Sequence, residues 1–177
     1  FITDKTGEQT HQLLSLAHQA LCTIPHRGGM NVEGIGDGAG VNIDLSLNFY
    51  RQRLQIANLE LGDFGVANFF FPFNHEYHAQ AKQLIEEYLH KYRLNMALWR
   101  EVPIDPSVMN DASRKQQQSI QQVIFLNDDL SRNAEHFEHQ INLALGEIES
   151  LGFTNDDLAG CYPLSMSSKT QVYKGRL

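Results

Sequence analysis

The amino-acid sequence predicts an α+β fold, in which helices and groups of strands alternate along the chain. Apolar residues recur at helical spacing in three segments, residues 13–21, 77–88 and 137–148. Apolar or alternating runs that are typical of strands lie between and after these segments, and no internal repeat is visible. With 177 residues, of which 42% are hydrophobic and 20% charged, the chain has the composition of a globular protein with a core. We therefore expect residues 1–177 to form a single α+β domain.

Three helices are predicted. Thr6 and Gln9 have the spacing of a capping box at the start of the first helix, and Asn74 can cap the second. The third should extend from near Asp129 to Ser150. Each helix has an apolar face that should point toward the core. These faces consist of Leu13, Leu14, Ala17, Ala20 and Leu21 in the first, Tyr77, Ala81, Leu84, Ile85 and Tyr88 in the second, and Phe137, Ile141, Leu145 and Ile148 in the third.

Strands are predicted where apolar residues alternate or form short runs. In chain order the segments are FITD (the end of a strand, residues 1–4), VNIDLSL (41–47), VANFFFPF (66–73), NMALWREVP (95–103), SIQQVIFLN (119–127), YPLSMSS (162–168) and TQVYKG (170–175). The third should end near Pro72, and a polar loop with Pro103 and Pro106 separates the next two. The last two should form a strand pair. Trp99 and the phenylalanines 69–71 should belong to the core.

Composition and charge exclude several classes of function. The formal net charge is −7, whereas sequence-independent binding of nucleic acid needs clustered Lys and Arg. No apolar run approaches the ~18 residues of a membrane span, and no secretory signal opens the sequence at Phe1. Two cysteines are too few for a disulfide scaffold or a zinc site. We expect a cytoplasmic protein that binds neither nucleic acid nor membrane.

The glycine-rich stretch HRGGMNVEGIGDGAG, residues 26–40, is the most unusual segment of the chain. Within it, GIGDGA fits the glycine fingerprint of dinucleotide-binding folds. That fingerprint binds pyrophosphate only when a strand precedes it and a helix follows, and here the predicted order is the reverse. The sequence therefore favours a tight loop, in which glycines adopt positive φ or let two backbones approach closely.

The histidines are candidate metal ligands, and the two cysteines are candidate nucleophiles. His75 and His78 are three residues apart, as are His136 and His139, but neither pair has the H-E-x-x-H spacing of catalytic zinc sites. Their polar neighbours favour solvated helix surfaces over a structural metal site. Cys22 and Cys161 are candidate nucleophiles, but neither has a nearby His-Asp set in the sequence, and both are predicted to lie in the core.

The motifs, taken in order, resemble a known family. HRGG, GDGAG, FFFP, WREVPID, QVIF and SMSSKTQVYKG resemble the amino-terminal glutamine amidotransferase domain of glutamate synthase, a class II domain of the N-terminal-nucleophile hydrolases. The likeness spans nearly the whole chain. It departs at Pro163, at Lys169 and in the GRL that follows YKG. The resemblance implies a partial four-layer αββα sandwich, with two stacked sheets between helical layers.

The resemblance also implies a reaction, the hydrolysis of the glutamine side-chain amide to glutamate and ammonia. In the family an amino-terminal cysteine is the nucleophile, and its own free amine, with a reference pKa of about 8, can act as the base. That cysteine is expected upstream of Phe1, so no catalytic residue is expected within this chain. The Asn-Gly of the oxyanion hole and an Arg-containing segment are expected beyond Leu177. We expect these 177 residues, trimmed at both ends, to be inactive by themselves.

Residue roles follow from the same resemblance. It implies that His26, Arg27, Gly28, Asp37 and Gly38 belong to a loop that supports the nucleophile. No metal or cofactor is expected in this chain, while FMN and an iron–sulfur cluster are implied for the synthase region. The implied partners are glutamine and that synthase region or a synthase subunit. A homo-oligomer would follow if sheet surface is left exposed.

Two other functions stay open. The chain could be part of an amidotransferase-like scaffold or binding module without catalysis, or of a stand-alone glutaminase subunit that serves a separate synthase chain. The sequence does not decide between NADPH and ferredoxin as the electron donor.

Overall fold

A computed structural model describes residues 4–24, 29, 31–36, 38–128 and 133–175. Within these residues the strands form two antiparallel sheets. The larger has the order β3 (Leu94–Glu101), β4 (Ile120–Asn127), β2 (Phe64–Phe70) and β5 (Tyr162–Ser167), and the smaller pairs β1 (Ala39–Asp44) with β6 (Thr170–Gly175).

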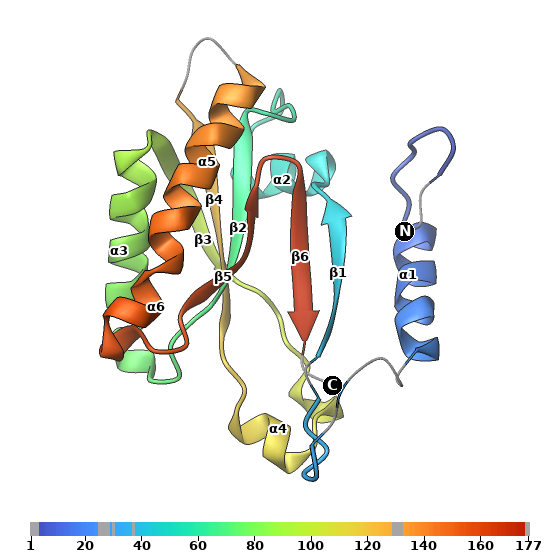
Figure 1. The fold of residues 1–177 in the computed structure, drawn as a ribbon. Helices are drawn as coiled ribbons and strands as arrows, with labels where there is room; N and C mark the ends of the chain where they lie inside the picture. Colours follow the sequence, from blue (N-terminus) through green and yellow to red (C-terminus); the bar gives the residue numbers. More distant parts are fainter. Residues whose placement is uncertain (1–3, 25–28, 30, 37, 129–132, 176–177) are drawn as a thin grey trace.

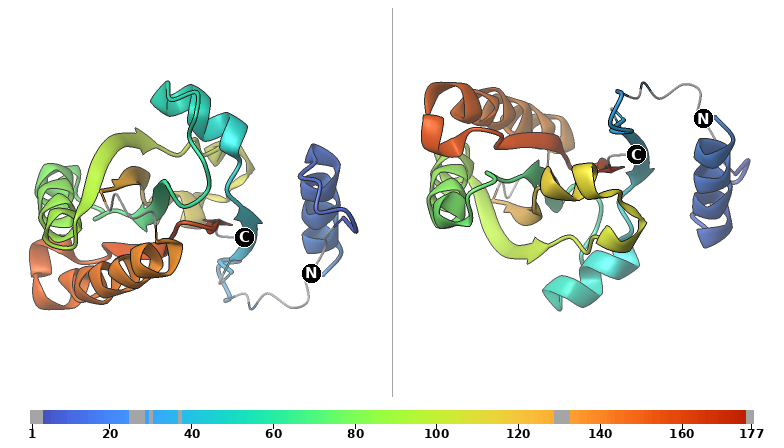
Figure 2. Two further views of the ribbon diagram at one scale, coloured as in Figure 1. Left: turned by 90° about the horizontal axis from the view of Figure 1, so that it is seen from above. Right: turned by 90° about the horizontal axis from the view of Figure 1, so that it is seen from below.

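The elements are arranged in layers (Figure 1). Helices α3 (His78–Lys91) and α5 (Ala134–Glu149) cover one face of the four-stranded sheet, and the β1–β6 sheet lies on its other side. Helix α1 (His11–Thr23) stands beyond the β1–β6 sheet, as the views from above and below also show (Figure 2). The order helices, sheet, sheet, helix confirms the predicted α+β class and follows the layer order of the expected sandwich.

The main core lies between the four-stranded sheet and helices α3 and α5. Close packing there depends on Gly65, because a Cβ at this position would lie 2.4 Å from the Phe125 ring and 3.2 Å from the Ile141 side chain. The large side chains that are fully buried in this core come from both layers: Phe69, Phe71, Ile85, Leu89, Leu94, Phe125, Phe137 and Ile141. Trp99 is half-buried at its margin. The prediction that phenylalanines 69–71 belong to the core is confirmed for Phe69 and Phe71, whereas Phe70 is half-buried.

A second, smaller core covers the other face of the sheet, and it contains a helix that was not predicted. Strand β1 ends at Asp44, and α2 (Leu47–Leu54) begins at Leu47, where the predicted strand 41–47 was expected to end. The strand prediction was wrong at this end because Leu47, Tyr50 and Leu54 recur at helical spacing and all pack toward one cluster. The buried members of that cluster are Leu45, Tyr50, Leu59, Phe64, Val66 and Ile124.

The middle of the chain follows the prediction. Strand β2 ends at Phe70, before Pro72, and Asn74 accepts a 3.1 Å hydrogen bond from the Glu76 backbone nitrogen. That cap begins the 3-10 turn His75–Tyr77, which leads into α3. All five residues of the predicted face of α3 are buried or half-buried. The polar loop predicted between β3 and β4 contains a 3-10 turn, Pro106–Val108, and a short helix, α4 (Asp111–Lys115), which were not predicted.

Helix α5 begins later than predicted. It starts at Ala134 because Asn133 caps it, accepting 3.1 Å hydrogen bonds from the backbone nitrogens of Glu135 and His136. Residues 129–132, which were predicted to be helical, lie outside the described residues. Three residues of the predicted face are buried, but Leu145 is half-buried and Ala144 takes the central position instead. Short elements α6 (Leu151–Thr154) and the 3-10 turn Asp156–Leu158 follow.

The last two strands do not pair with each other, so the predicted strand pair was wrong. Strand β5 pairs with β2, and β6 pairs with β1 in the other sheet. The change of sheet follows from Glu138 of α5, whose carboxylate accepts hydrogen bonds from the Ser167 hydroxyl (2.8 Å) and the Ser168 backbone nitrogen (3.0 Å). The connection is thereby held against α5, and the Lys169 carbonyl accepts a 3.0 Å bond from the Leu45 nitrogen in the smaller core.

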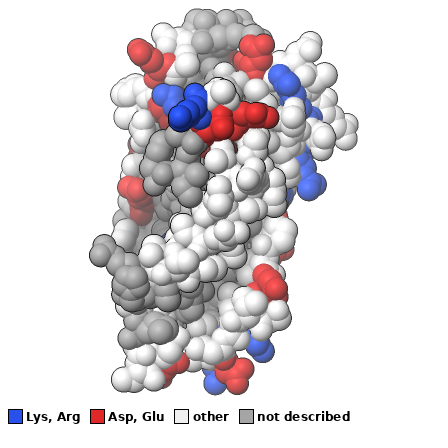
Figure 3. All heavy atoms as spheres, turned by 90° about the vertical axis from the view of Figure 1, so that its right-hand side faces the viewer, with Lys and Arg blue, Asp and Glu red and all other residues white. Residues whose placement is uncertain are grey.

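The first helix differs from its prediction in two ways. Thr10, not Thr6, is its N-cap, and the Thr10 hydroxyl oxygen accepts a 3.3 Å hydrogen bond from the Leu13 backbone nitrogen. Thr6 instead bonds to Asp4, with its backbone nitrogen 2.7 Å from the Asp4 carboxylate oxygen. The predicted apolar face is only half-buried or exposed, and no residue of α1 is buried. α1 has no Asp, Glu, Lys or Arg, and most described atoms on its side of the molecule belong to uncharged residues (Figure 3). Residues 1–3 of the predicted opening strand lie outside the described residues.

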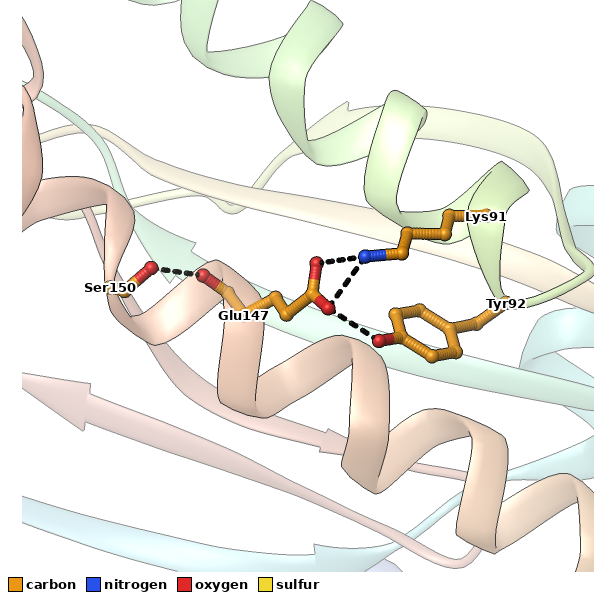
Figure 4. Close-up of polar contacts among 4 residues, drawn as sticks. All are labelled: Lys91, Tyr92, Glu147 and Ser150. Carbon is orange, nitrogen blue, oxygen red and sulfur yellow. Dashed lines mark hydrogen bonds and ion pairs between the residues drawn. The ribbon is translucent and has the colours of Figure 1, made fainter.

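A polar contact joins α3 to α5 on the outer side of the main core (Figure 4). The Lys91 ammonium lies 2.7 and 2.8 Å from the two carboxylate oxygens of Glu147, and the Tyr92 hydroxyl donates a 2.6 Å hydrogen bond to the same carboxylate. These bonds lower the pKa of Glu147, the one from Lys91 most strongly, and they raise the pKa values of Lys91 and Tyr92. The side chains remain accessible to water, so the contact orients the two helices more than it stabilises them.

Candidate functional site between the two sheets

The described part of the glycine-rich segment forms a tight turn. The Asn31 side-chain oxygen accepts 3.0 Å hydrogen bonds from the backbone nitrogens of Glu33 and Ile35, and Gly34 closes the turn on the Asn31 carbonyl. Gly34 and Gly38 have φ of +72° and +92°, which non-glycine residues rarely adopt. The predicted tight loop is therefore confirmed where the structure describes it. Four of the predicted supporting residues, His26, Arg27, Gly28 and Asp37, lie outside the described residues, and Gly38 is half-buried.

The loop is held from two sides. Asn110 donates hydrogen bonds to the carbonyls of Gly34 (3.1 Å) and Glu33 (3.4 Å), while its own side-chain oxygen caps α4. On the other side the loop runs into β1, where a Cβ at Gly40 would lie 2.9 Å from the Tyr173 carbonyl oxygen of β6. Glycine at this position thus permits the close approach of β1 to β6. These contacts fix the paths of residues 31–36 and 38–40 beside the β1–β6 sheet.

A buried polar network lies between the two sheets and centres on Gln171 of β6. The side-chain oxygen of Gln171 accepts three hydrogen bonds, from the Tyr50 hydroxyl at 2.5 Å, the Tyr173 hydroxyl at 3.1 Å and the Gln122 amide at 3.2 Å. Tyr50 and Gln122 are fully buried, and Gln171 is 4% exposed. Burial, followed by the nearby Tyr173, raises the pKa of Tyr50 well above its ordinary value. Tyr50 therefore stays a neutral hydrogen-bond donor at neutral pH.

The network continues across the four-stranded sheet. Gln122 donates a 2.7 Å hydrogen bond to the Asn68 side-chain oxygen and accepts one of 2.7 Å from the Arg100 guanidinium. Asn68 in turn donates a 2.8 Å bond to the Val172 carbonyl of β6. Buried polar groups are costly unless they are paired, and each of these amides has partners. The network therefore fixes β6, and with it the edge of β1, relative to the larger sheet.

Sequence reasoning missed this network. The sequence does contain a signal for it, namely a polar amide in the interior of a predicted strand. Asn68 lies between the apolar residues Ala67 and Phe69, and Gln122 is followed by the apolar Val123. The network can orient backbone and side chains, but amides, phenols and a guanidinium do not gain or lose a proton near neutral pH and therefore make poor acid–base catalysts. Its chemistry is that of a support, and a nucleophile and its base have to come from other residues.

The two cysteines are placed differently. Cys161 is 3% exposed at the start of β5, as predicted, and burial raises its pKa to about 11, so the thiol is almost entirely protonated at neutral pH. Cys22 is exposed near the end of α1, so its predicted core position was wrong, because α1 buries none of its side chains. Both are free thiols.

The histidine pairs do not form a metal site in the structure. His136 and His139 are exposed on α5, as predicted. His75 is also exposed, but His78 is half-buried, with Nε2 2.9 Å from the Pro72 carbonyl oxygen and its ring edge-on to Phe71. The prediction of a solvated surface was therefore wrong for His78. No group of three or more His, Cys, Asp or Glu side chains in the described ranges is arranged to hold a metal ion.

Comparison with known proteins places this scaffold in a family. All 177 residues match the family of class-II glutamine amidotransferases. The chain belongs to this family. The class II amidotransferase sequence is 28% identical to "Glutamate synthase [NADH]" of Saccharomyces cerevisiae over all of this chain and 9% of that protein. It is 29% identical to the "Glutamate synthase [NADPH] large chain" of Bacillus subtilis, over 97% of this chain and 11% of that protein.

A third relative of the amidotransferase chain is the ferredoxin-dependent glutamate synthase of Pyropia yezoensis, 30% identical over all of this chain and 12% of that protein. The chain thus spans about a tenth of the length of these relatives. The resemblance to the amidotransferase domain of glutamate synthase is confirmed. None of the helices in the described part of the chain is long and apolar enough to cross a membrane.

Proposed function

We propose that this chain is part of the glutaminase domain of a glutamate synthase and that the domain releases ammonia from the side-chain amide of glutamine. The observation that carries the proposal is the match of all 177 residues to class-II glutamine amidotransferases, together with relatives that are named glutamate synthases. The ammonia would be transferred reductively to 2-oxoglutarate by the synthase region. We further propose that residues 1–177 belong to a single domain.

The nucleophile of the proposed reaction is neither Cys22 nor Cys161. Cys161 is buried, and its raised pKa leaves little thiolate at neutral pH. Cys22 is exposed on a helix whose side chains contact little else. The proposed nucleophile is a cysteine outside these 177 residues, upstream of Phe1 as the family resemblance implies. These residues alone are then inactive.

The proposed role of the glycine-rich loop is to hold that nucleophile. His26, Arg27, Gly28, Asp37 and Gly38 are the residues assigned to this role by the resemblance. In support, the neighbouring residues 31–36 and 38–40 are fixed by Asn110 and by the approach of β1 to β6. A loop with a fixed path can position an adjacent group within the small tolerances that catalysis requires.

Cofactors and partners are proposed for the larger protein. An iron–sulfur cluster needs several cysteine thiolates, and this chain has two cysteines, one buried and one on α1. Its residues do not fit a cluster, so FMN and the cluster are assigned to the synthase region, and no step is derived through them. Two free thiols support a reducing cytoplasm. Two exposed leucines of α1, Leu14 and Leu16, support self-association of the chain.

Ammonia release from L-glutamine by the intact polypeptide tests the proposed function. We expect turnover, and Arg27→Ala should reduce it while leaving the melting temperature nearly unchanged. Arg53→Ala, at an exposed position of α2, is the matched control and should retain activity. No ammonia release from the intact polypeptide would favour a non-catalytic module, and a large stability loss with normal activity in Arg27→Ala would assign that residue a structural role.

A further inference from the structure

A pocket of about 270 Å³ lies beside the loop that follows β3, between α4 and the end of β6. One wall is apolar and includes Phe70, Ile104, Met109 and Ile120. The polar lining includes Ser113, Lys174 and the glutamines 116–118. This volume is below the ~300–1,000 Å³ that is typical of sites for drug-sized molecules, so a ligand of this pocket must be small.

Ser113 lines this pocket, and its hydroxyl is buried and, within the described ranges, unpaired. The residue is 3% exposed, and its Oγ has no hydrogen-bond partner among the described residues. Its backbone nitrogen is already used, since it donates a 2.7 Å bond to the cap residue Asn110. A buried hydroxyl without a partner costs free energy, and a ligand that bonds to it would remove that cost.

Lys174 contributes the charge. It is the one ionised side chain among the described residues that line the pocket. It is exposed, and its backbone is fixed because Gly40 of β1 pairs with it in the β1–β6 sheet. An ammonium group beside an apolar wall attracts an anion whose remaining atoms are apolar.

We propose that this pocket binds a small monocarboxylate with an apolar body and a second hydrogen-bonding group. The carboxylate pairs with Lys174, the body contacts the apolar wall, and the second group bonds to the Ser113 hydroxyl. 4-Hydroxyphenylacetate has these three features and is the probe. Phenylacetate lacks the second polar group, and 4-hydroxyphenylacetamide lacks the charge.

Calorimetric titration of the intact polypeptide tests the proposal. We expect saturable binding of 4-hydroxyphenylacetate, with affinity reduced about tenfold for the amide and in Lys174→Met. Ser113→Ala should weaken 4-hydroxyphenylacetate about fivefold but leave phenylacetate within about twofold. Lys169→Met, which removes an exposed lysine in the β5–β6 connection, is the matched control and should bind normally.

The free protein gives a second readout. Because Ser113→Ala removes a hydroxyl that has no partner, it should leave the melting temperature without ligand unchanged or higher. A lower melting temperature would show that the hydroxyl is paired, and that result overturns the proposal. Titration without saturation would also overturn it, and so would an equal affinity for 4-hydroxyphenylacetate in the unchanged protein, Lys174→Met and Ser113→Ala. Displacement of the probe by L-glutamine would overturn it as well, because it would assign the pocket to the glutamine site.

Discussion

The Tyr50 hydroxyl donates a 2.5 Å hydrogen bond to the side-chain oxygen of Gln171, and this bond joins α2 to β6 across the space between the two sheets. Two further donors, Tyr173 and Gln122, share the same acceptor. Gln171 therefore holds β6 to the larger sheet, together with the hydrogen bond from Asn68 to the Val172 carbonyl. Because β6 pairs with β1, the position of Ala39 and Gly40, where the glycine-rich stretch joins β1, depends on the same contact.

Removing that acceptor should destabilise the protein. Gln171→Met leaves three donors without their shared acceptor, and we expect a loss of at least about 2 kcal/mol in the free energy of unfolding. Tyr50→Phe removes one donor and leaves the acceptor with two, so it should cost about 0.5–1.5 kcal/mol. Urea unfolding measures both. Gln52→Met, at an exposed site on α2, should change stability by less than about 0.5 kcal/mol, and equal losses for the two glutamine variants would refute the role of the network.

The main core gives a second prediction. Ile141 is fully buried and packs over Gly65 and Phe125, so Ile141→Ala should cost about 2–5 kcal/mol of unfolding free energy. Leu145→Ala, at a half-buried position, should cost less, and Leu143→Ala, at a residue that is 44% exposed, should cost least. A denaturant series on the three variants checks this order. A small effect of Ile141→Ala would mean that α5 presents a different face to the sheet.

The contact between Lys91 and Glu147 predicts a pH dependence of stability. The pKa of Glu147 is lowered from its ordinary 4.5, so its contribution is present above that value and is lost as the pH falls through the folded-state pKa. The pKa of Lys91 is raised from 10.5, so its contribution is present below that value and is lost as the pH rises through the folded-state pKa. The melting-temperature difference between the unchanged protein and Glu147→Gln should therefore be constant near neutral pH and shrink at both extremes.

Glu149→Gln is the matched control for that measurement, because Glu149 is an exposed residue of the same helix. Its melting temperature should follow that of the unchanged protein at every pH. Added salt should reduce the Glu147→Gln difference, since the contact is open to water. A difference that stays the same from pH 3 to 11 would contradict the assignment to these two groups.

The two thiols should differ in reactivity. Cys22 is exposed and should react with a maleimide in the folded protein, whereas Cys161 is buried, has a pKa of about 11 and should react only when the protein opens. Peptide mapping by mass spectrometry after brief labelling at pH 7.5 measures both. Equally rapid labelling of Cys161 in the folded state would show that β5 does not shield it.

The sequence predicted those helices and strands whose apolar period or capping residue is visible within a short segment of the chain. Strand β2 ends before Pro72, α3 follows the cap at Asn74, and α5 presents Phe137 and Ile141 inward, each from a period or a cap that is visible in the sequence. Helix α2 was missed because it is short and four of its eight residues are polar, and its first residue, Leu47, was assigned to the end of the preceding strand.

What the sequence did not predict depends on contacts between distant residues. The segments around β5 and β6 look like a hairpin, but Glu138 of α5 directs them into different sheets. The inter-sheet network unites Tyr50, Gln122 and Gln171, which are far apart in the chain and have no shared local pattern. The loop residues assigned from the family resemblance, Arg27 among them, remain predictions.

The most direct test of the account locates the reactive thiol. The intact polypeptide is treated with 6-diazo-5-oxo-L-norleucine, a glutamine analogue whose diazoketone alkylates the nucleophile, and the modified peptide is identified by mass spectrometry. We predict a single adduct on a cysteine outside the peptides that contain Cys22 and Cys161, protected by L-glutamine and accompanied by loss of ammonia release. A glutamine-protected adduct on Cys22 or Cys161 would contradict the account.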